Sequence, residues 1–208
     1  DITEQLRTLE ELQSVMGMKK AYNFFMDAPV IIGYVKGDDY TIELANQRLL
    51  EVWERSNDVI GKPLFKAIPE LERQGVKGLL DQVRYSGKPF FAYEHPLTFS
   101  RNGRTETLYF DFVYQPHYEN NDPIATGVIS VGHNVTEQVR VRHKFRHVID
   151  QAEDPILIFK GRDMVLDVAN KALFSLWQID ESYIGKPFLE ILPEMKEQGF
   201  LEKLQRVY

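Results

Sequence analysis

The sequence contains no cysteine among its 208 residues. This absence excludes disulfide bonds, thiolate zinc sites, cysteine nucleophiles and flavin adducts on cysteine. The chain also has no uninterrupted apolar run of the roughly 18–20 residues that cross a membrane, and its first residues do not resemble a signal peptide. We therefore expect a globular protein of the cytoplasm without membrane contact in this part of the chain, whether its parent is soluble or membrane-anchored.

Motifs of catalysis are absent as well. The sequence has no G-x-x-x-x-G-K-[ST] phosphate loop, no G-x-G-x-x-G and no H-E-x-x-H. A net charge of −6 argues against a nucleic-acid partner. His143 and His147 have the i, i+4 spacing of metal ligands, but their neighbours are basic and oppose a cation: Arg140, Arg142, Lys144 and Arg146. We predict no catalytic residue and no metal site, so an enzymatic role for this chain is uncertain.

What the chain does contain is an internal repeat. When the sequence is shifted by 124 positions, residues 28–84 align with residues 152–208 without a gap and share 19 identities over 57 positions. The identities include Asn46 with Asn170, Trp53 with Trp177, and an Ile-Gly-Lys-Pro stretch at 60–63 and 184–187. Such self-similarity at a fixed offset indicates a tandem duplication.

A second internal sequence match indicates the expected domain organisation. Residues 1–7 (Asp-Ile-Thr-Glu-Gln-Leu-Arg) match residues 134–140 (Asn-Val-Thr-Glu-Gln-Val-Arg), which follow the first repeat. We therefore expect residues 1–21 to be a helical linker after an upstream unit, 22–138 a complete domain, 139–151 a second linker, and 152–208 the first half of another domain. A half sheet cannot close a core unaided, so the fold after about residue 145 is expected to be incomplete or to depend on a partner.

The hydrophobic periods within one repeat predict an α+β fold. Two short strands are followed by helical segments and then by three longer strands, of which the first two join at an Asn-Gly turn, a strong hairpin signal. The expected strands are 29–35, 40–45, 90–100, 105–115 and 123–133, and the main helices are 47–55 and 71–85. These elements predict a five-stranded antiparallel sheet with helices on one face, flanked by amphipathic linker helices.

This layout resembles a PAS domain. The resemblance is carried by the asparagine after the second strand (Asn46, Asn170), the Gly-Lys-Pro turn, the spacing of the last three strands, and the closing Asn-Val-Thr-Glu at 134–137. The family often closes on Asp-Ile-Thr-Glu, so Asn134 is a departure that keeps the cap but loses the charge. The resemblance implies a sensory and dimerisation module, most often in a bacterial two-component phosphorelay. We expect a homodimer, neighbouring PAS units, and a histidine-kinase output domain elsewhere in the parent chain.

A ligand in such a fold would lie between the sheet and the helices. Candidate lining residues are Ile32, Tyr34, Trp53, Phe65, Leu80, Phe91, Tyr93, His95, Phe110, Phe112 and Ile129. Tyr34, Tyr93 and His95 would supply the polar contacts, since a buried hydroxyl or imidazole needs a partner. The alternative is that these residues simply fill the core. An enclosed void of about 300 Å³ or more would favour sensing, and no void would favour a structural spacer.

The resemblance also limits the cofactor. Haem-binding members hold iron through a histidine on the helix before the third strand, and residues 71–85 contain none, so haem of that type is not expected. A cysteine-adduct flavin is excluded because there is no cysteine. A non-covalent ligand that stacks on aromatic rings stays open. The cofactor is therefore unknown.

The flanking helices are the expected interface between copies and the route of the signal. Leu9 and Met16 lie on the apolar stripe of the first helix, and Val141 and Phe145 on that of the outgoing helix. The outgoing helix begins with a capping motif formed by Asn134, Thr136 and Glu137.

A third alternative is a cone-shaped α+β isomerase. It would need an acid–base pair in a pocket, for which His95 and Asp111 are the inward-leaning candidates. Asp111 is expected on the opposite strand face from Phe110 and Phe112, which counts against this reading.

Overall fold

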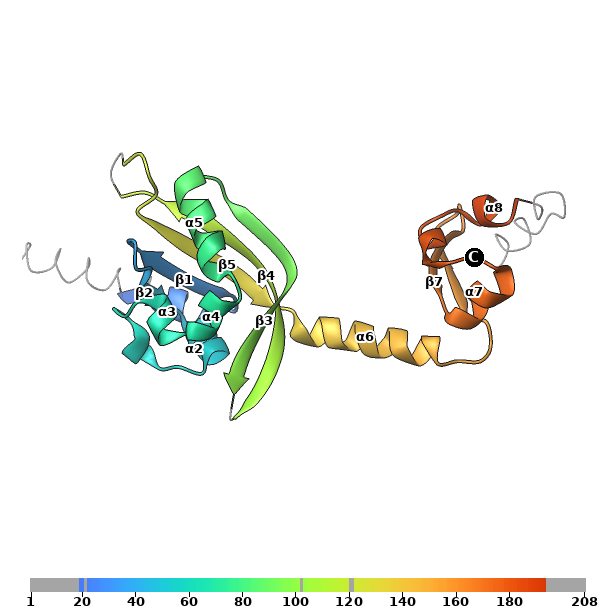
Figure 1. Ribbon diagram of the computed structural model, residues 1–208, viewed down its shortest axis with the longest axis horizontal. Helices are drawn as coiled ribbons and strands as arrows, with labels where there is room; N and C mark the ends of the chain where they lie inside the picture. The colour runs from blue at the N-terminus through green and yellow to red at the C-terminus, as the bar shows by residue number, and fades with distance from the viewer. Residues whose placement is uncertain (1–18, 21, 102, 120–121, 194–208) are drawn as a thin grey trace, which may run out of the picture. The chain divides into compact units, whose positions relative to one another are not determined.

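Residues 19–20, 22–101, 103–119 and 122–193 are described by the computed structural model (Figure 1). The chain divides into two units, Asp1–Val139 and Arg140–Tyr208, here named unit 1 and unit 2. A helical segment over residues 22–26 leads into the first strand of unit 1. The linker predicted for residues 1–21, with Leu9 and Met16, lies almost wholly outside the described residues.

Unit 1 is built on one antiparallel sheet of five strands in the order β2-β1-β5-β4-β3 (Figure 1). The chain therefore returns from β3 and β4 to place its last strand in the centre of the sheet, beside the first. This arrangement confirms the predicted α+β class. The strands are β1 (Ile31–Lys36), β2 (Thr41–Ala45), β3 (Phe90–Arg101), β4 (Arg104–His117) and β5 (Gly127–Asn134).

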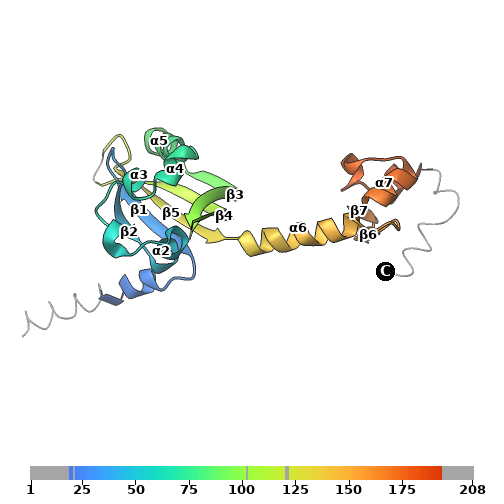
Figure 2. The same ribbon diagram turned by 60° about the horizontal axis from the view of Figure 1, so that its bottom comes forward.

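The helices of unit 1 lie on one side of this sheet (Figures 1 and 2). The predicted helix 71–85 is two helices, because Gln74 and Gly75 break it and Gly75 has a left-handed φ of 81°. Glycine adopts that conformation without a steric penalty. The elements in chain order are α2 (Gln47–Trp53), η1 (Asn57–Val59), α3 (Leu64–Ala67), α4 (Pro69–Arg73) and α5 (Val76–Ser86).

Asn46 fixes the junction between the sheet and the first of these helices. Its side-chain oxygen accepts hydrogen bonds from the backbone N–H of Leu49 (3.1 Å) and of Ile32 (3.0 Å), and its amide donates to the carbonyl of Val30 (2.7 Å). The residue is fully buried. One side chain thus caps α2 and ties it to the start of β1, which explains why asparagine follows the second strand in both repeats.

A β-bulge in β3 reverses the alternation of that strand. The register with β4 shifts between Ala92 and His95, and Glu94 has a left-handed φ of 48°. Before the bulge Ala92 faces the helices, while Phe91 and Tyr93 face away; beyond it Leu97 and Phe99 are buried. An irregularity of this kind re-aims every side chain on one side of it.

Unit 2 repeats the beginning of unit 1. Asn170 accepts from the backbone of Leu173 and Ile156, as Asn46 does from Leu49 and Ile32. A small core forms around Leu166, Leu173 and Ile191. The elements are the strands β6 (Leu157–Lys160) and β7 (Val165–Ala169), α7 (Lys171–Trp177), η2 (Glu181–Tyr183) and α8 (Phe188–Ile191). The helix α6 (Thr136–Asp150) starts in unit 1 directly after β5.

Candidate functional site

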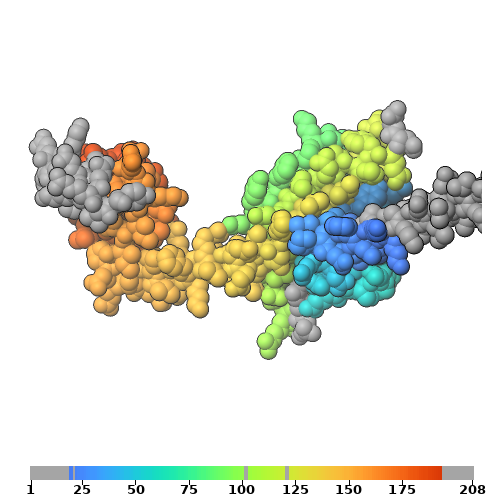
Figure 3. Space-filling model, turned by 180° about the vertical axis from the view of Figure 1, so that it is seen from behind, coloured from blue at the N-terminus to red at the C-terminus, as the bar shows by residue number. Residues whose placement is uncertain are grey.

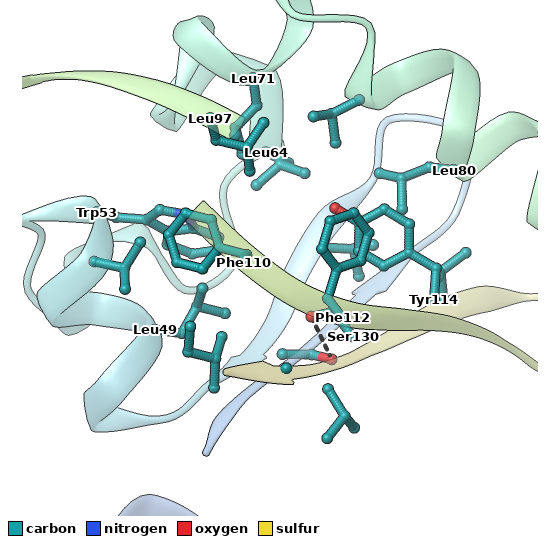
Figure 4. Close-up of a pocket in the computed structure, with 18 of the residues that line it drawn as sticks. Leu49, Trp53, Leu64, Leu71, Leu80, Leu97, Phe110, Phe112, Tyr114 and Ser130 are labelled. Atoms are coloured by element: carbon teal, nitrogen blue, oxygen red, sulfur yellow. Dashed lines mark hydrogen bonds between the residues drawn. The ribbon is translucent and has the colours of Figure 1, made fainter. Parts of the chain in front are cut away.

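A cavity of about 80 Å³ lies between the inner face of the sheet and the helices of unit 1 (Figure 4). Its wall is almost entirely apolar and comes from all layers of the unit: Leu49 and Trp53 from α2, Leu80 from α5, Phe110 and Phe112 from β4. Pockets that hold drug-sized or cofactor-sized ligands measure about 300–1,000 Å³, so this cavity is well below that range.

Three polar side chains face this apolar space. The Tyr114 side chain points into the cavity (Figure 4), and within the described part of the chain no group hydrogen-bonds to its hydroxyl. The indole N–H of Trp53 is likewise without a described partner, whereas Ser130 donates weakly to the carbonyl of Gly33 at 3.4 Å. Burial raises the pKa of Tyr114, so its hydroxyl stays neutral and keeps its proton. The cavity therefore offers hydrogen-bond donors to an uncharged acceptor.

Four of the eleven predicted lining residues lie on the cavity wall: Trp53, Leu80, Phe110 and Phe112. Two others, Phe65 and His95, do not line it. Phe65 packs edge-on against Tyr40, with 5.9 Å between ring centroids. His95 packs edge-on against Phe112 at 5.6 Å.

The prediction was wrong for the remaining five residues, because they lie on the outer face of the sheet. These are Ile32, Tyr34, Phe91, Tyr93 and Ile129, none of which lines the cavity. In β1 the inward positions are Ile31, Gly33 and Val35, so the prediction was out of phase by one residue. In β3 the bulge places the two aromatic residues outside. Phe91 is 61% exposed and Tyr93 is 78% exposed.

Sequence reasoning also missed the residues that give the cavity its chemistry. The wall includes Gly33, Ser130 and Gly132, which carry no apolar signal. A Cβ on Gly33 would come within 2.6 Å of Leu49, and one on Gly132 within 2.8 Å of Phe112, so both glycines make room for large neighbours. Tyr114 could have been found, since it continues the alternation of Leu108, Phe110 and Phe112 in β4.

The outgoing helix is hydrogen-bonded to the strand that forms the cavity wall. The Thr136 hydroxyl accepts from the backbone N–H of Tyr109 (2.8 Å), and the Val135 N–H donates to the Tyr109 carbonyl (2.8 Å). Asn134 in turn accepts from the Thr136 N–H at 3.0 Å, and Val139 is buried in unit 1. Since Tyr109 precedes Phe110 in β4, one residue separates the cavity wall from the hydrogen bonds to the first turn of α6.

Beyond this first turn α6 carries an exposed apolar stripe. Val141 is 56% exposed, Phe145 53% and Val148 59%. Glu137 is also exposed. Of the residues predicted for the interface and signal helix, Asn134 and Thr136 thus make the junction with the sheet, while Val141 and Phe145 are available to another surface.

The acid–base pair of the isomerase alternative is not assembled. The Asp111 carboxylate lies on the outer side of the sheet and accepts from the Glu94 N–H at 2.6 Å. His95 is paired with Phe110, whose side chain faces the cavity. The two groups are on opposite faces and cannot serve one pocket.

Comparisons with known proteins place the chain in a family. The sequence profile of the PAS fold matches residues 25–140, and a second profile, PAS domain, matches residues 143–206. No described helix is long and apolar enough to cross a membrane.

Several solved structures are similar. The PAS domain of BvgS from Bordetella pertussis has a TM-score of 0.47 and 20% identity, over 64% of this chain and 96% of that one. A sensory box sensor histidine kinase from Vibrio cholerae has a TM-score of 0.40 and 14% identity, over 62% and 98%. An RNA-binding light-oxygen-voltage receptor has a TM-score of 0.48 and 15% identity, and this chain spans only 37% of it. The family profiles and the five-stranded sheet together establish that the chain belongs to the PAS family and holds two PAS units in tandem.

Proposed function

We propose that this chain is a sensory signalling module, the PAS region of a sensor histidine kinase, in which the state of the cavity in unit 1 is passed to α6. The observation that carries the proposal is the pair of hydrogen bonds between Tyr109 and the segment Val135–Thr136 at the base of that helix. They join a cavity-wall strand to the outgoing helix, so two packings of the wall would give two settings of α6.

The stimulus that fits the cavity is a small neutral molecule with a hydrogen-bond acceptor. The donors of Tyr114 and Trp53 have no described protein partner. An acceptor such as a carbonyl oxygen would hydrogen-bond with them, while the apolar wall would take the rest of the molecule. A charged ligand would be desolvated without compensation.

The runner-up function is a structural spacer, and the size of the cavity favours it. Its volume of about 80 Å³ is well below the roughly 300 Å³ expected of a ligand site, and about half of an engineered apolar cavity that takes benzene. Water alone would then satisfy Tyr114. The two functions differ in whether a ligand, once bound, changes α6.

The proposed module acts as a homodimer paired through α6. Val141, Phe145 and Val148 are spaced by four and three residues, as are successive core positions of a coiled coil. With Phe145 at position a, Glu137 falls at g and Arg142 at e. A parallel, in-register pair would bring these opposite charges together across the interface. Both copies would then deliver their signal in the same direction along the chain.

The wider setting is part of the same proposal. We assign residues 22–138 to a complete PAS unit, 139–151 to a linker and 152–208 to the beginning of a second unit, supported by the internal repeat. Further PAS units and a kinase domain would lie elsewhere in a parent chain of the cytoplasm or the cytoplasmic side of a membrane.

The test is binding of 2-butanone, a small ketone, to the purified chain and to Tyr114→Phe, followed by NMR. We expect shifts of the Leu80 and Leu49 methyl groups and of the first-turn amides of α6, with at least tenfold weaker binding to the variant. Native mass spectrometry and an absorbance spectrum of the untreated protein report any ligand that co-purifies. Methyl shifts that stop at the cavity and leave α6 unchanged would contradict the relay and support the spacer.

A further inference from the structure

A second hollow lies at the surface of unit 1, next to the start of α6. It measures about 340 Å³ and is formed by the segment before β1, by α2 and by the end of β5. In the space-filling view from behind, blue and cyan atoms from the early segments border the yellow atoms of β5 (Figure 3). We name this hollow the groove. Its polar lining residues are Arg48, Glu51, His133 and Asn134.

The groove and the cavity share a wall. Ile31 of β1 and Val52 of α2 line both of them, whereas a third hollow, beside Arg84 and Ile124, shares no residue with the cavity. Val52 belongs to a helix, where a β-branched side chain keeps nearly one χ1 rotamer. Ile31 belongs to a strand and has a second side-chain torsion, so the end of its side chain can turn aside while the backbone stays in place. Ile31 is therefore the part of this wall that moves most easily.

Joined, the two spaces have the size and the character of a ligand site. Their volumes of about 80 and 340 Å³ come to about 420 Å³, inside the range of about 300–1,000 Å³ for sites that hold small molecules. The inner end is apolar apart from Trp53, Tyr114 and Ser130, and the outer end carries charged side chains. A molecule that fills both must therefore combine an apolar chain with a polar head.

The donors of the groove favour a carboxylate as that head. The Arg48 guanidinium donates through Nη1 to Glu51 at 3.2 Å, and no described group bonds to its Nε or Nη2. Asn134 accepts through Oδ1 from the Thr136 N–H, and its side-chain N–H groups have no described acceptor. The Glu51 carboxylate, in contrast, also accepts from Gln47 at 3.3 Å. The groove thus has donors left over, and their bonds to a carboxylate would be charge-assisted.

We propose that the groove is the head-group subsite of the cavity, and that the whole site takes a carboxylic acid with an apolar chain. The inference rests on the proposed function and names the class of its ligand. Asn134 is paired with Phe110, and Ser130 with Tyr114, so about four residues or 13 Å of strand separate the groove from the position of Tyr114. A chain of several carbons is needed to span that distance.

This arrangement keeps the charge out of the apolar space. The neutral chain would enter the cavity past Ile31, and the carboxylate would stay at the surface with Arg48, so no ion is buried without a partner. The head would also touch the cap of α6, because the Asn134 side chain that donates to it holds the Thr136 N–H at 3.0 Å. Ligand binding would therefore order the first turn of α6 directly, in addition to the path through Tyr109.

Competition between three probes tests whether the two spaces are joined. Octanoate should shift the Leu80 and Leu49 methyl groups together with the side-chain amide of Asn134, in NMR spectra of the full chain. It should displace 2-butanone, which occupies the cavity alone, whereas acetate should leave 2-butanone in place. If octanoate shifts Asn134 and leaves both leucines unchanged, the wall at Ile31 and Val52 stays closed and the proposal is wrong.

Two groove variants with opposite expected effects test the head group. Arg48→Gln removes the cation and should weaken octanoate binding roughly fivefold or more, while Glu51→Gln removes the repelling carboxylate and should strengthen it. The matched control is Arg73→Gln, an exposed arginine of α4 outside the groove, which should leave binding unchanged. All three side chains are exposed, so the variants should keep the fold, which circular dichroism checks. Equal affinities of Arg48→Gln and Arg73→Gln, or tighter binding of octylammonium than of octanoate, would overturn the carboxylate assignment.

The same spectra separate this inference from the function it rests on. If 2-butanone shifts the cavity methyl groups and α6 while octanoate leaves Leu80 unchanged, the groove is no part of the site and the proposed relay stands. If octanoate fills both spaces and the first-turn amides of α6 do not respond, the subsite stands and the relay is wrong. If neither probe shifts Leu80, both proposals fail.

Discussion

At the residue scale, Asn46 makes more hydrogen bonds than the helix cap that its position in the sequence suggests. It bonds the backbone of α2, of β1 and of the segment before β1, and it does so from a fully buried position. Asn46→Ala removes the cap and leaves the partly buried Ile32 N–H and Val30 carbonyl without this partner. We expect a loss of about 2–4 kcal/mol in unfolding free energy, measured by urea denaturation.

The second repeat provides the matched comparison. Asn170→Ala removes the same bonds in unit 2 and should leave the transition of unit 1 in place, and Gln47→Ala, at an exposed neighbouring site, should cost little. An Asn46→Ala protein as stable as Gln47→Ala would show that the hydrogen bonds of Asn46 contribute nothing measurable to the unfolding free energy.

A second residue-scale prediction concerns acid sensitivity. The buried Tyr40 hydroxyl donates to Asp81 at 2.5 Å, and Lys77 pairs with the same carboxylate at 2.9 Å. Partial burial raises the pKa of Asp81, but these two bonds outweigh it and hold the pKa below its usual 3.8. The stabilisation from Asp81 is therefore present above pH 3.8 and is lost as the pH falls through the lower value of the folded protein.

Tyr40→Phe should lower stability at neutral pH by about 1.5–3 kcal/mol and should also flatten its decline in acid, because Asp81 returns toward its ordinary pKa. Urea denaturation from pH 7 to pH 3 measures both. Tyr114→Phe removes a hydroxyl without a described partner and should change neither. An acid profile of Tyr40→Phe parallel to that of the wild type would contradict the assignment.

At the element scale, how far the sequence predicts a strand depends on what occupies its inward positions. In β4 these are Leu108, Phe110, Phe112 and Tyr114, all large, so the alternation of the sequence alone indicates the inward face of this strand. In β1 and β5 the inward positions include Gly33, Ser130 and Gly132, which make no hydrophobic pattern. Their outward neighbours Ile32 and Ile129 gave the stronger signal and shifted the phase.

Two irregularities of the chain could also not be predicted from the hydrophobic periodicity of the sequence. The β3 bulge depends on the left-handed backbone of Glu94, and glutamate is not a residue type that indicates such a conformation in a sequence. The break between α4 and α5 could have been read from Gly75, but the apolar spacing continues across it and favours one helix. Each irregularity is decided by tertiary contacts, here the pairing with β4 and the packing of Leu71 and Val76 in one core.

The junction of β4 with α6 gives the prediction at this scale. Thr136→Val keeps the shape of the side chain and removes the acceptor of the Tyr109 N–H. We expect a loss of about 1–3 kcal/mol and faster hydrogen exchange of the first turn of α6, measured by NMR.

Thr126→Val is the control, since the Thr126 hydroxyl accepts from the Glu119 N–H at 2.9 Å in another part of unit 1. It removes a bond of the same kind and should leave exchange in α6 unchanged. If both variants loosen α6 equally, the effect is one of global stability and the junction has no special role in the relay.

At the scale of the whole molecule, the repeat offers the same hydrogen bond in two surroundings. The backbone N–H of Ile32 donates to Asn46 at 3.0 Å, and that of Ile156 donates to Asn170 at 2.9 Å. Around Ile32 stands a five-stranded sheet, whereas the described part of unit 2 has a sheet of two strands. A lone two-stranded ribbon is at best marginally stable, and three or more strands or packing against a helix are needed.

Because the local bond is the same, any difference in exchange between these two amides reports the stability of the surrounding unit. The buried apolar cluster of unit 2 is smaller than that of unit 1 and consists of Leu166, Ala169, Leu173 and Ile191. We expect Ile156 to exchange at least tenfold faster than Ile32, measured by NMR on the intact chain under conditions where closing outpaces exchange. Equal protection of the two amides would mean that the packing of α7 on β6 and β7 is enough to stabilise unit 2, and the expectation that it depends on a partner would then be wrong.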